Sequence, residues 1–196
     1  MHRSPDLDHA AADAALLARD DVRRLLASRL HDPFTLLGRH GEEIRLWRPW
    51  AVAAWVGAER VPARRVGTSG LFVLRHDGAP GPHPEVHWRD VAGTMHCDID
   101  PYNFPPQIGD LDLHLFGEGR HRHAYRMLGA HTCTVDGIAG TRFATWAPNA
   151  ERVSVVGDFN QWDGRCHPMR VRGASGVWEL FLPGVGPGAL YRFELR

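Results

Sequence analysis

The sequence contains no lysine, so arginine supplies all 23 of its basic side chains. Its 23 acidic residues balance them to a formal net charge of +0. Surfaces that bind nucleic acid or anionic membranes need an excess of positive charge, so this balance argues against both kinds of partner. The missing lysine indicates a bias in codon composition and carries no functional meaning.

Cysteine and long apolar segments are also scarce. Cys97, Cys133 and Cys166 are scattered without a C-x-x-C pair, which is typical of a reducing cytoplasm and not of a disulfide scaffold. No stretch approaches the roughly 18 apolar residues of a membrane-spanning helix. The acidic, alanine-rich start lacks the basic residues and apolar run of a signal peptide. We therefore expect a cytoplasmic protein with no membrane partner.

Residues 1–31 predict an N-terminal helical segment. Ser4, Pro5 and Asp6 offer a cap, a proline at the first helical position and an acid in the first turn. Asp32 precedes Pro33, and a residue before proline avoids the α region, so the helix should stop there. We expect this segment to be mobile or to dock on the rest of the chain without taking part in chemistry.

The rest of the chain predicts an all-β fold. Short apolar stretches separated by glycine, proline and arginine indicate antiparallel strands, and no strand–helix–strand alternation suggests a parallel sheet. The strand-like stretches are 44–46, 52–56, 61–66, 71–74, 86–91, 142–145, 153–156, 177–182 and 191–195.

A weak internal repeat predicts that two related immunoglobulin-like β-sandwiches lie in tandem. The order of the matching pieces is the same in both halves. The pairs are 36–40 with 127–131, 47–49 with 146–148, and 55–57 with 155–157. We place the first sandwich at 32–99 and the second at 114–196. Residues 100–113 between them read as a proline-rich linker, although Tyr102, Phe104 and Ile108 suggest that it packs against something.

One turn of the second half stands out. Gly157 ends a β-branched strand, and polar turn formers then surround Trp162 up to Gly164. A buried core does not need a tryptophan between Gln161 and Asp163, but a ligand platform can use one. The other tryptophans lie mostly in predicted strands and are expected in the core; Trp178 alternates with leucines and should point inward.

Residues that carry catalysis, metals or cofactors are not evident. Glycosidic chemistry needs two carboxylates about 5–10 Å apart on a rigid scaffold, whereas Asp158, Asp163, Glu179 and Glu194 are isolated and read as solvated or turn-capping groups. No catalytic residue is therefore assigned. The spacing of His121, His123, His131 and Cys133 fits no standard zinc pattern. We expect neither a metal nor a cofactor.

Four segments carry a resemblance to a known family. The longest is WAPNAERVSVVGDFNQWDGRCHPM at 146–169, which resembles the family 48 carbohydrate-binding module that precedes the catalytic barrel in 1,4-α-glucan branching enzymes. Segments 31–40, 100–119 and 124–131 agree with it, so the resemblance covers roughly residue 32 to the end. It implies a first sandwich followed by a module at 114–196 that is incomplete at its C-terminal end.

The resemblance also implies a partner and a site. The partner would be an α-1,4-glucan such as glycogen or amylose. Trp162 matches the tryptophan of the FNxW turn that stacks on glucan, and Arg192 matches a basic residue that bonds sugar hydroxyls, with Gln161 as a polar neighbour. The same surface is alternatively used to dock the barrel within the parent enzyme. The family's second stacking tryptophan has no counterpart before Arg196.

Two rival functions fit part of the sequence. A stand-alone glycogen-binding module, as in the regulatory subunits of energy-sensing kinases, lacks segments like 32–40 and 100–119. A debranching or trehalose-releasing enzyme with the same module does not explain the doubled sandwich. The preferred interpretation is the N-terminal accessory region of a branching enzyme of glycogen biosynthesis, with catalysis in a barrel of typically about 250 residues outside this chain.

This interpretation predicts that the 196-residue chain forms no α-1,6 branches. The physical reason is that no pair of carboxylates on a barrel is available. The pure chain is incubated with amylose and new α-1,6 linkages are measured. Turnover that scales with the concentration of the chain would contradict the prediction.

Overall fold

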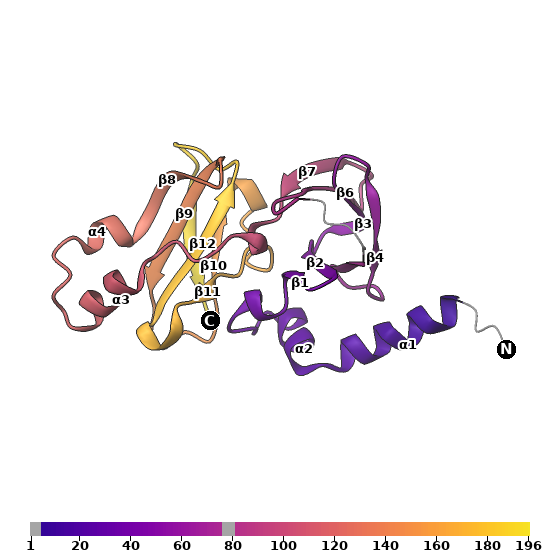
Figure 1. Cartoon of the computed structure of the whole chain (residues 1–196), viewed down its shortest axis with the longest axis horizontal. Helices are drawn as coiled ribbons and strands as arrows, with labels where there is room; N and C mark the ends of the chain where they lie inside the picture. The colour runs from indigo at the N-terminus through magenta and orange to yellow at the C-terminus, as the bar shows by residue number, and fades with distance from the viewer. Residues whose placement is uncertain (1–4, 76–80) are drawn as a thin grey trace.

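The computed structural model describes residues 5–75 and 81–196. Two β-sheet units lie side by side, and a helical segment runs beneath the first of them (Figure 1). The all-β fold class predicted from the strand pattern is confirmed. None of the described helices is long and apolar enough to cross a bilayer.

The N-terminal segment is two helices, and the prediction of one helix up to Asp32 is wrong. Helix α1 (Pro5–Ala18) ends before Arg19, whose backbone is extended, and α2 (Asp20–Leu26) follows. Asp20 and Asp21 place acidic side chains in the first turn of α2, where negative charge is favourable, and the Asp21 carboxylate accepts the N–H of Val22 within that turn. The predicted cap at Ser4 lies outside the described residues.

Seven antiparallel strands form one curled sheet in the first unit. The sheet folds at β4, which pairs with both β3 and β5, and side chains of β2 and β5 then meet those of β3 and β6 in one core. The sheet order is β1-β2-β5-β4-β3-β6-β7. The strands are β1 (Gly38–His40), β2 (Glu43–Trp47), β3 (Ala51–Val56), β4 (Val61–Arg65), β5 (Leu71–Arg75), β6 (Glu85–Asp90) and β7 (Met95–Ile99).

Two facing sheets form the second unit. A four-stranded sheet has the order β11-β12-β9-β8, and a two-stranded sheet pairs β10 with β13. Trp178 is 1% exposed between them, which confirms the inward orientation predicted from its alternation with leucine. The strands are β8 (Gly129–Val135), β9 (Ile138–Trp146), β10 (Val153–Gly157), β11 (Arg170–Val171), β12 (Val177–Pro183) and β13 (Tyr191–Leu195).

The segment between the units is packed and not an extended spacer. The 3₁₀ turn Pro101–Asn103 is followed by α3 (Asp110–Gly117) and α4 (Ala124–Met127), and Tyr102, Phe104 and Ile108 are all buried. The buried Glu179 carboxylate of β12 accepts the N–H of Ile108 at 2.9 Å. The apolar side chains of this segment had indicated such packing.

The two halves repeat the same local geometry. Gly38 and Gly129 both have positive φ, and in each half a histidine three residues after a leucine bonds that leucine's carbonyl: His40 to Leu37 at 3.1 Å, and His131 to Leu128 at 2.9 Å. In each half the residue after the repeated tryptophan donates its N–H to a glycine carbonyl at 2.8 Å, Arg48 to Gly70 and Ala147 to Gly176. These shared bonds support the related halves inferred from the weak sequence repeat.

One core cluster spans both units. It contains Trp47 and Leu71 of the first unit, Phe143 and Trp178 of the second, and Leu25 of α2. Because buried apolar area stabilises whatever elements share it, the two sheets and α2 should unfold together.

Arg48 and Asp100 form a buried ion pair in the first unit. Its guanidinium bonds Asp98, and it also bonds Asp100 at 3.1 Å and the Trp47 carbonyl at 2.8 Å. Burial raises the pKa of Asp100 to about 6, and the neighbouring Arg48 charge opposes this effect. Asp100 also accepts the N–H of Tyr102, so the pair fixes the start of the inter-unit segment.

We expect Arg48→Met to lower the free energy of unfolding by about 3–5 kcal/mol at pH 7, because it leaves the Asp100 carboxylate buried without its partner. Urea unfolding measures the loss. The matched control is Arg24→Met, which removes an exposed pair with Asp20 at 2.7 Å and should cost less than about 1 kcal/mol. Equal losses in the two variants would contradict the structural role given to Arg48.

Candidate functional site

The candidate site is the turn that follows β10. Strand β10 ends at Gly157, a position that only glycine fits, because a Cβ there would lie 2.3 Å from the Leu190 carbonyl oxygen. Asn160 then ties the turn to the strand: its Oδ1 accepts the Gly157 N–H at 2.8 Å and its Nδ2 donates to the Val155 carbonyl at 2.9 Å. These bonds give the polar segment after Gly157 a fixed shape before any ligand arrives.

Trp162 stands on this turn as a half-exposed ring. Gln161 and Trp162 both have left-handed backbone, with φ of 52° and 61°, which costs energy in non-glycine residues. The Trp162 indole is held by a bond from its Nε1 to Asp158 Oδ1 at 3.0 Å, and the residue is 41% exposed. The turn thus aims an indole at solvent, while Gln161 beside it is also exposed.

The structure brings Arg192 to the same place. Strand β13 pairs with β10 so that Arg192 is opposite Val156. The Arg192 guanidinium carbon lies over the Trp162 ring, 5.9 Å from its centroid, within the range of a cation–π contact. The three residues predicted from the sequence, Trp162, Gln161 and Arg192, therefore lie on one exposed surface formed by a turn and a neighbouring strand.

The first unit holds this turn from below. The Trp50 Nε1 donates to Asp163 Oδ2 at 2.9 Å, and the Trp47 Nε1 donates to the Arg165 carbonyl at 2.6 Å. Asp163 also accepts Arg165 Nη2 at 2.6 Å, and these hydrogen bonds lower the pKa of its carboxyl against the raising effect of burial. The position of the Trp162 turn thus depends on two tryptophans from outside its own unit.

The isolated carboxylates all have structural partners. Asp158 accepts the Trp162 indole and Asp163 accepts Trp50, while Glu194 pairs with Arg152. Glu179 is 2% exposed, so its interpretation as a solvated or turn-capping group is wrong. It lies inside because backbone N–H groups and Arg172 satisfy its charge. None of the four is paired with another carboxylate for acid–base work.

The histidines considered for zinc have separate partners. His121 bonds Asp112 at 2.8 Å and His131 bonds the Leu128 carbonyl, so the structure does not bring them to one centre. Within residues 5–75 and 81–196, one group of three possible metal ligands does occur, formed by Glu85, His87 and Cys97. The sequence pattern did not indicate it, because His87 and Cys97 lie ten residues apart on two strands and match no standard zinc-ligand spacing.

Trp146 departs from the expectation that strand tryptophans lie in the core. It is 54% exposed and contacts Phe116 edge to face at 5.9 Å. Its repeat counterpart Trp47 is buried because the second unit covers it. Exposure of these two tryptophans is therefore set by what packs on the fold and not by the strand itself.

Two family descriptions divide the chain between them. Residues 18–87 match "alpha-1,4-glucan branching enzyme GlgB, N-terminal domain", and residues 127–196 match "Carbohydrate-binding module 48 (Isoamylase N-terminal domain)". The second match contains the Trp162 turn and Arg192. The fold and site thus define a pair of accessory β domains, the second of them a carbohydrate-binding module.

Curated relatives agree with this pairing. The chain is 53% identical over 191 residues to the 1,4-alpha-glucan branching enzyme GlgB of Methylococcus capsulatus, covering 94% of this chain and 26% of that protein. The corresponding enzyme of Nitrosococcus oceani is 50% identical over 182 residues (89% and 24%), and GlgB 1 of Streptomyces coelicolor 50% over 196 residues (94% and 24%). The chain spans about a quarter of the length of these relatives. Over most of its length the chain corresponds to the N-terminal region of glycogen branching enzymes.

His167 lies under the Trp162 turn and must be neutral there. Asn160 Nδ2 donates to its Nδ1 at 2.9 Å, so that nitrogen carries no proton. Burial, with the nearby Arg48 charge, lowers the pKa of His167 to about 4. Because the folded pKa lies below the unfolded value of about 6.5, the neutral ring stabilises the fold above that pH, and this stability is lost as the pH falls toward 4.

Between pH 7 and pH 5, we therefore expect the unfolding free energy of the wild type to fall by about 2 kcal/mol more than that of His167→Gln. The glutamine side chain in this variant does not titrate. Urea unfolding at both pH values measures the difference. Asp100 acts in the opposite sense, but it is present in both proteins and cancels. The exposed His123→Gln serves as the control and should follow wild type. Parallel pH curves for wild type and His167→Gln would contradict the assignment.

Proposed function

We propose that this chain positions α-1,4-glucan for a branching enzyme of glycogen biosynthesis. The parent would cleave an α-1,4-glucan and transfer the piece to a 6-hydroxyl, which makes α-1,6 branches. Glycogen and amylose are the proposed ligands, the cytoplasm is the proposed location, and the chemistry is assigned to a catalytic barrel outside this chain. The single observation that carries the proposal is the exposed, pre-positioned indole of Trp162 among polar side chains.

The surface suits a sugar chain for a physical reason. A flat indole covers the apolar face of a glucose ring, and the ring's hydroxyls then need hydrogen-bond partners at its rim. Gln161 and Arg192 supply such groups within one exposed surface. The indole is fixed by Asp158 and by the backbone, so little side-chain freedom is lost on binding.

The two family matches differ in which of the rival functions they favour. The module match alone, whose description names isoamylase, is compatible with a debranching enzyme or with a stand-alone glycogen-binding module. The match of residues 18–87 to the N-terminal domain of a branching enzyme favours the first proposal over both. Docking of the barrel on the Trp162 surface remains the competing role of the site itself.

The test is Trp162→Ala in native gels that contain amylose. A single stacking site of this kind should bind with a Kd of roughly 1 mM, about −4 kcal/mol. Loss of the ring should cost on the order of 1 kcal/mol and weaken retardation about fivefold. Because Trp162 lies on an exposed turn, its removal should leave the urea unfolding free energy within about 1 kcal/mol of wild type.

Trp146→Ala is the matched control, because Trp146 is an exposed indole of the same unit outside the turn. It should be retarded like wild type. Absence of retardation in wild type, or equal retardation of all three proteins, would overturn glucan binding at Trp162 and favour docking. A stability loss of about 3–5 kcal/mol in Trp162→Ala would identify Trp162 as a packing residue.

A further inference from the structure

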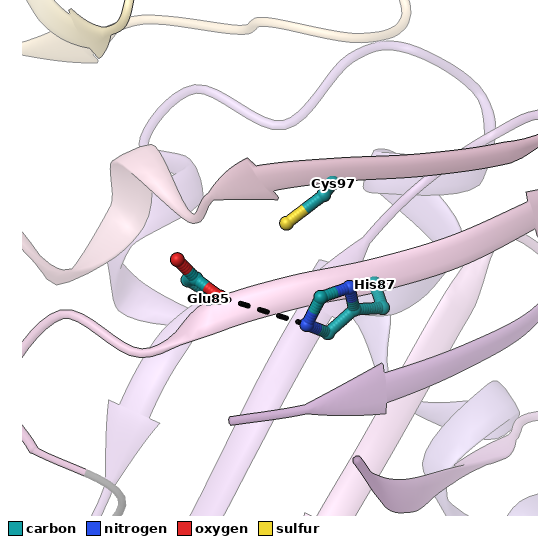
Figure 2. Close-up of side chains that lie close together, drawn as sticks. All are labelled: Glu85, His87 and Cys97. Atoms are coloured by element: carbon teal, nitrogen blue, oxygen red, sulfur yellow. Dashed lines mark ion pairs between the residues drawn. The ribbon is translucent and has the colours of Figure 1, made fainter. Parts of the chain in front are cut away.

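Three side chains with metal-binding atoms meet on the outer face of the first unit. Glu85 and His87 are two residues apart on β6 and therefore project from the same face of the strand. Cys97 on β7 is the direct register partner of His87. Figure 2 shows the carboxylate, imidazole and thiol together, with Cys97 reaching over from the neighbouring strand.

The distances are close to those of a tetrahedral centre. One ligand atom from each residue lies within 4.8 Å of the other two, and His87 Nε2 is 3.6 Å from Glu85 Oε2. Zinc binds such atoms at about 2.0–2.3 Å, which places tetrahedral ligands roughly 3.5 Å apart. Glu85 and Cys97 are exposed, so small side-chain rotations suffice to close the remaining gap.

The strands hold the group in place from the other face. Trp88 stacks on His96 with ring centroids 4.0 Å apart, and the Trp88 Nε1 donates to Asp98 Oδ2 at 2.8 Å. These contacts fix the β6–β7 register that sets Cys97 opposite His87. The His87 side chain is only 13% exposed, which restricts its ring, while β7 is an edge strand and leaves the group open to solvent.

The three ligand atoms, a carboxylate oxygen, an imidazole nitrogen and a thiol sulfur, favour one class of metal ion. A thiolate, an imidazole and a carboxylate together suit borderline divalent ions such as Zn²⁺, whereas Mg²⁺ and Ca²⁺ prefer oxygen alone. Because the ligand is the thiolate, binding releases the thiol proton, and the thiolate together with the carboxylate balances the two charges of the ion.

We propose that Glu85, His87 and Cys97 form a Zn²⁺-binding site with a water molecule as the fourth ligand. Because β7 is the edge strand and Asp98 directly follows Cys97, the ion would fasten this edge next to the carboxylate that pairs with Arg48. The role is structural, since the site joins two strands of one sheet and contains none of Trp162, Gln161 and Arg192.

The test uses Co²⁺ as a spectroscopic probe for the 196-residue chain under reducing conditions. One equivalent of Co²⁺ should produce a thiolate-to-metal charge-transfer band, and Zn²⁺ should displace the cobalt and abolish the band. The midpoint of thermal unfolding should rise with free Zn²⁺, because an ion that binds only the folded state stabilises it. Cys97→Ser should remove both signals. His87→Gln should lower the affinity for the ion at least about tenfold, because even the loss of a hydrogen-bond partner of a metal ligand lowers metal affinity by that much.

Cys133→Ser is the matched control, because it removes another accessible thiol that is not part of the group. It should behave like wild type in both measurements. If Cys97→Ser lowers stability even in the presence of a chelator, its loss of both signals could come from a disturbed fold. Glu85→Gln is then the second test, because Glu85 is largely exposed and its replacement should weaken metal binding without disturbing the fold. Absence of a charge-transfer band in wild type, a band that survives in Cys97→Ser, or a band lost in Cys133→Ser would overturn the proposal.

Discussion

The buried ion pair of Arg48 with Asp100, joined on its exposed side by Asp98, is the constraint on which the arrangement at the junction of the two units depends. A guanidinium and carboxylates taken out of water are tolerated only when their partners are present and aligned. Here the alignment fixes three segments at once: the end of β2, the edge strand β7 and the start of the inter-unit segment. The pair therefore contributes orientation, while the apolar cluster that both units share contributes most of the cohesion.

The same junction sets the chemistry of the candidate site. Arg48 adds to the burial that keeps His167 neutral, and a neutral His167 accepts the hydrogen bond that orients Asn160. Asn160 in turn shapes the turn on which Trp162 stands. The exposed platform is thus connected to a buried charge of the other unit through a short chain of polar contacts.

The sequence was sufficient for the fold class and for the inner strands, and the three side chains that it proposed as a site lie on one exposed surface. Alternation placed Trp178 in the core, and a tryptophan between polar turn formers identified Trp162 as exposed. The break of the N-terminal helix at Arg19 was missed because apolar periodicity continues through it, while Arg19 adopts an extended backbone and a new helix begins at Asp20. The burial of Glu179 was missed for a related reason, since its partners are backbone groups more than 70 residues away.

Tertiary contacts also determine whether equivalent positions of the repeat are buried or exposed. Trp47 and Trp146 occupy the same place in the repeat, yet one is buried and the other exposed, because only Trp47 has a second unit packed on it. A pattern that reports local structure cannot distinguish these two cases. Likewise, the proximity of Cys97 to His87 follows from hairpin register, which no short motif encodes.

The fastening of the Trp162 turn by Trp47 and Trp50 has a consequence for how such modules are inherited. A boundary drawn near residue 100 assigns those two indoles to one domain and the turn to another. A gene rearrangement at that boundary would carry away every residue of the platform but leave two of its supports behind. The module would then keep its sequence signature and its fold but lose two hydrogen bonds that hold the Trp162 turn in place. The geometry of a surface on the second unit therefore depends on side chains that belong to the first.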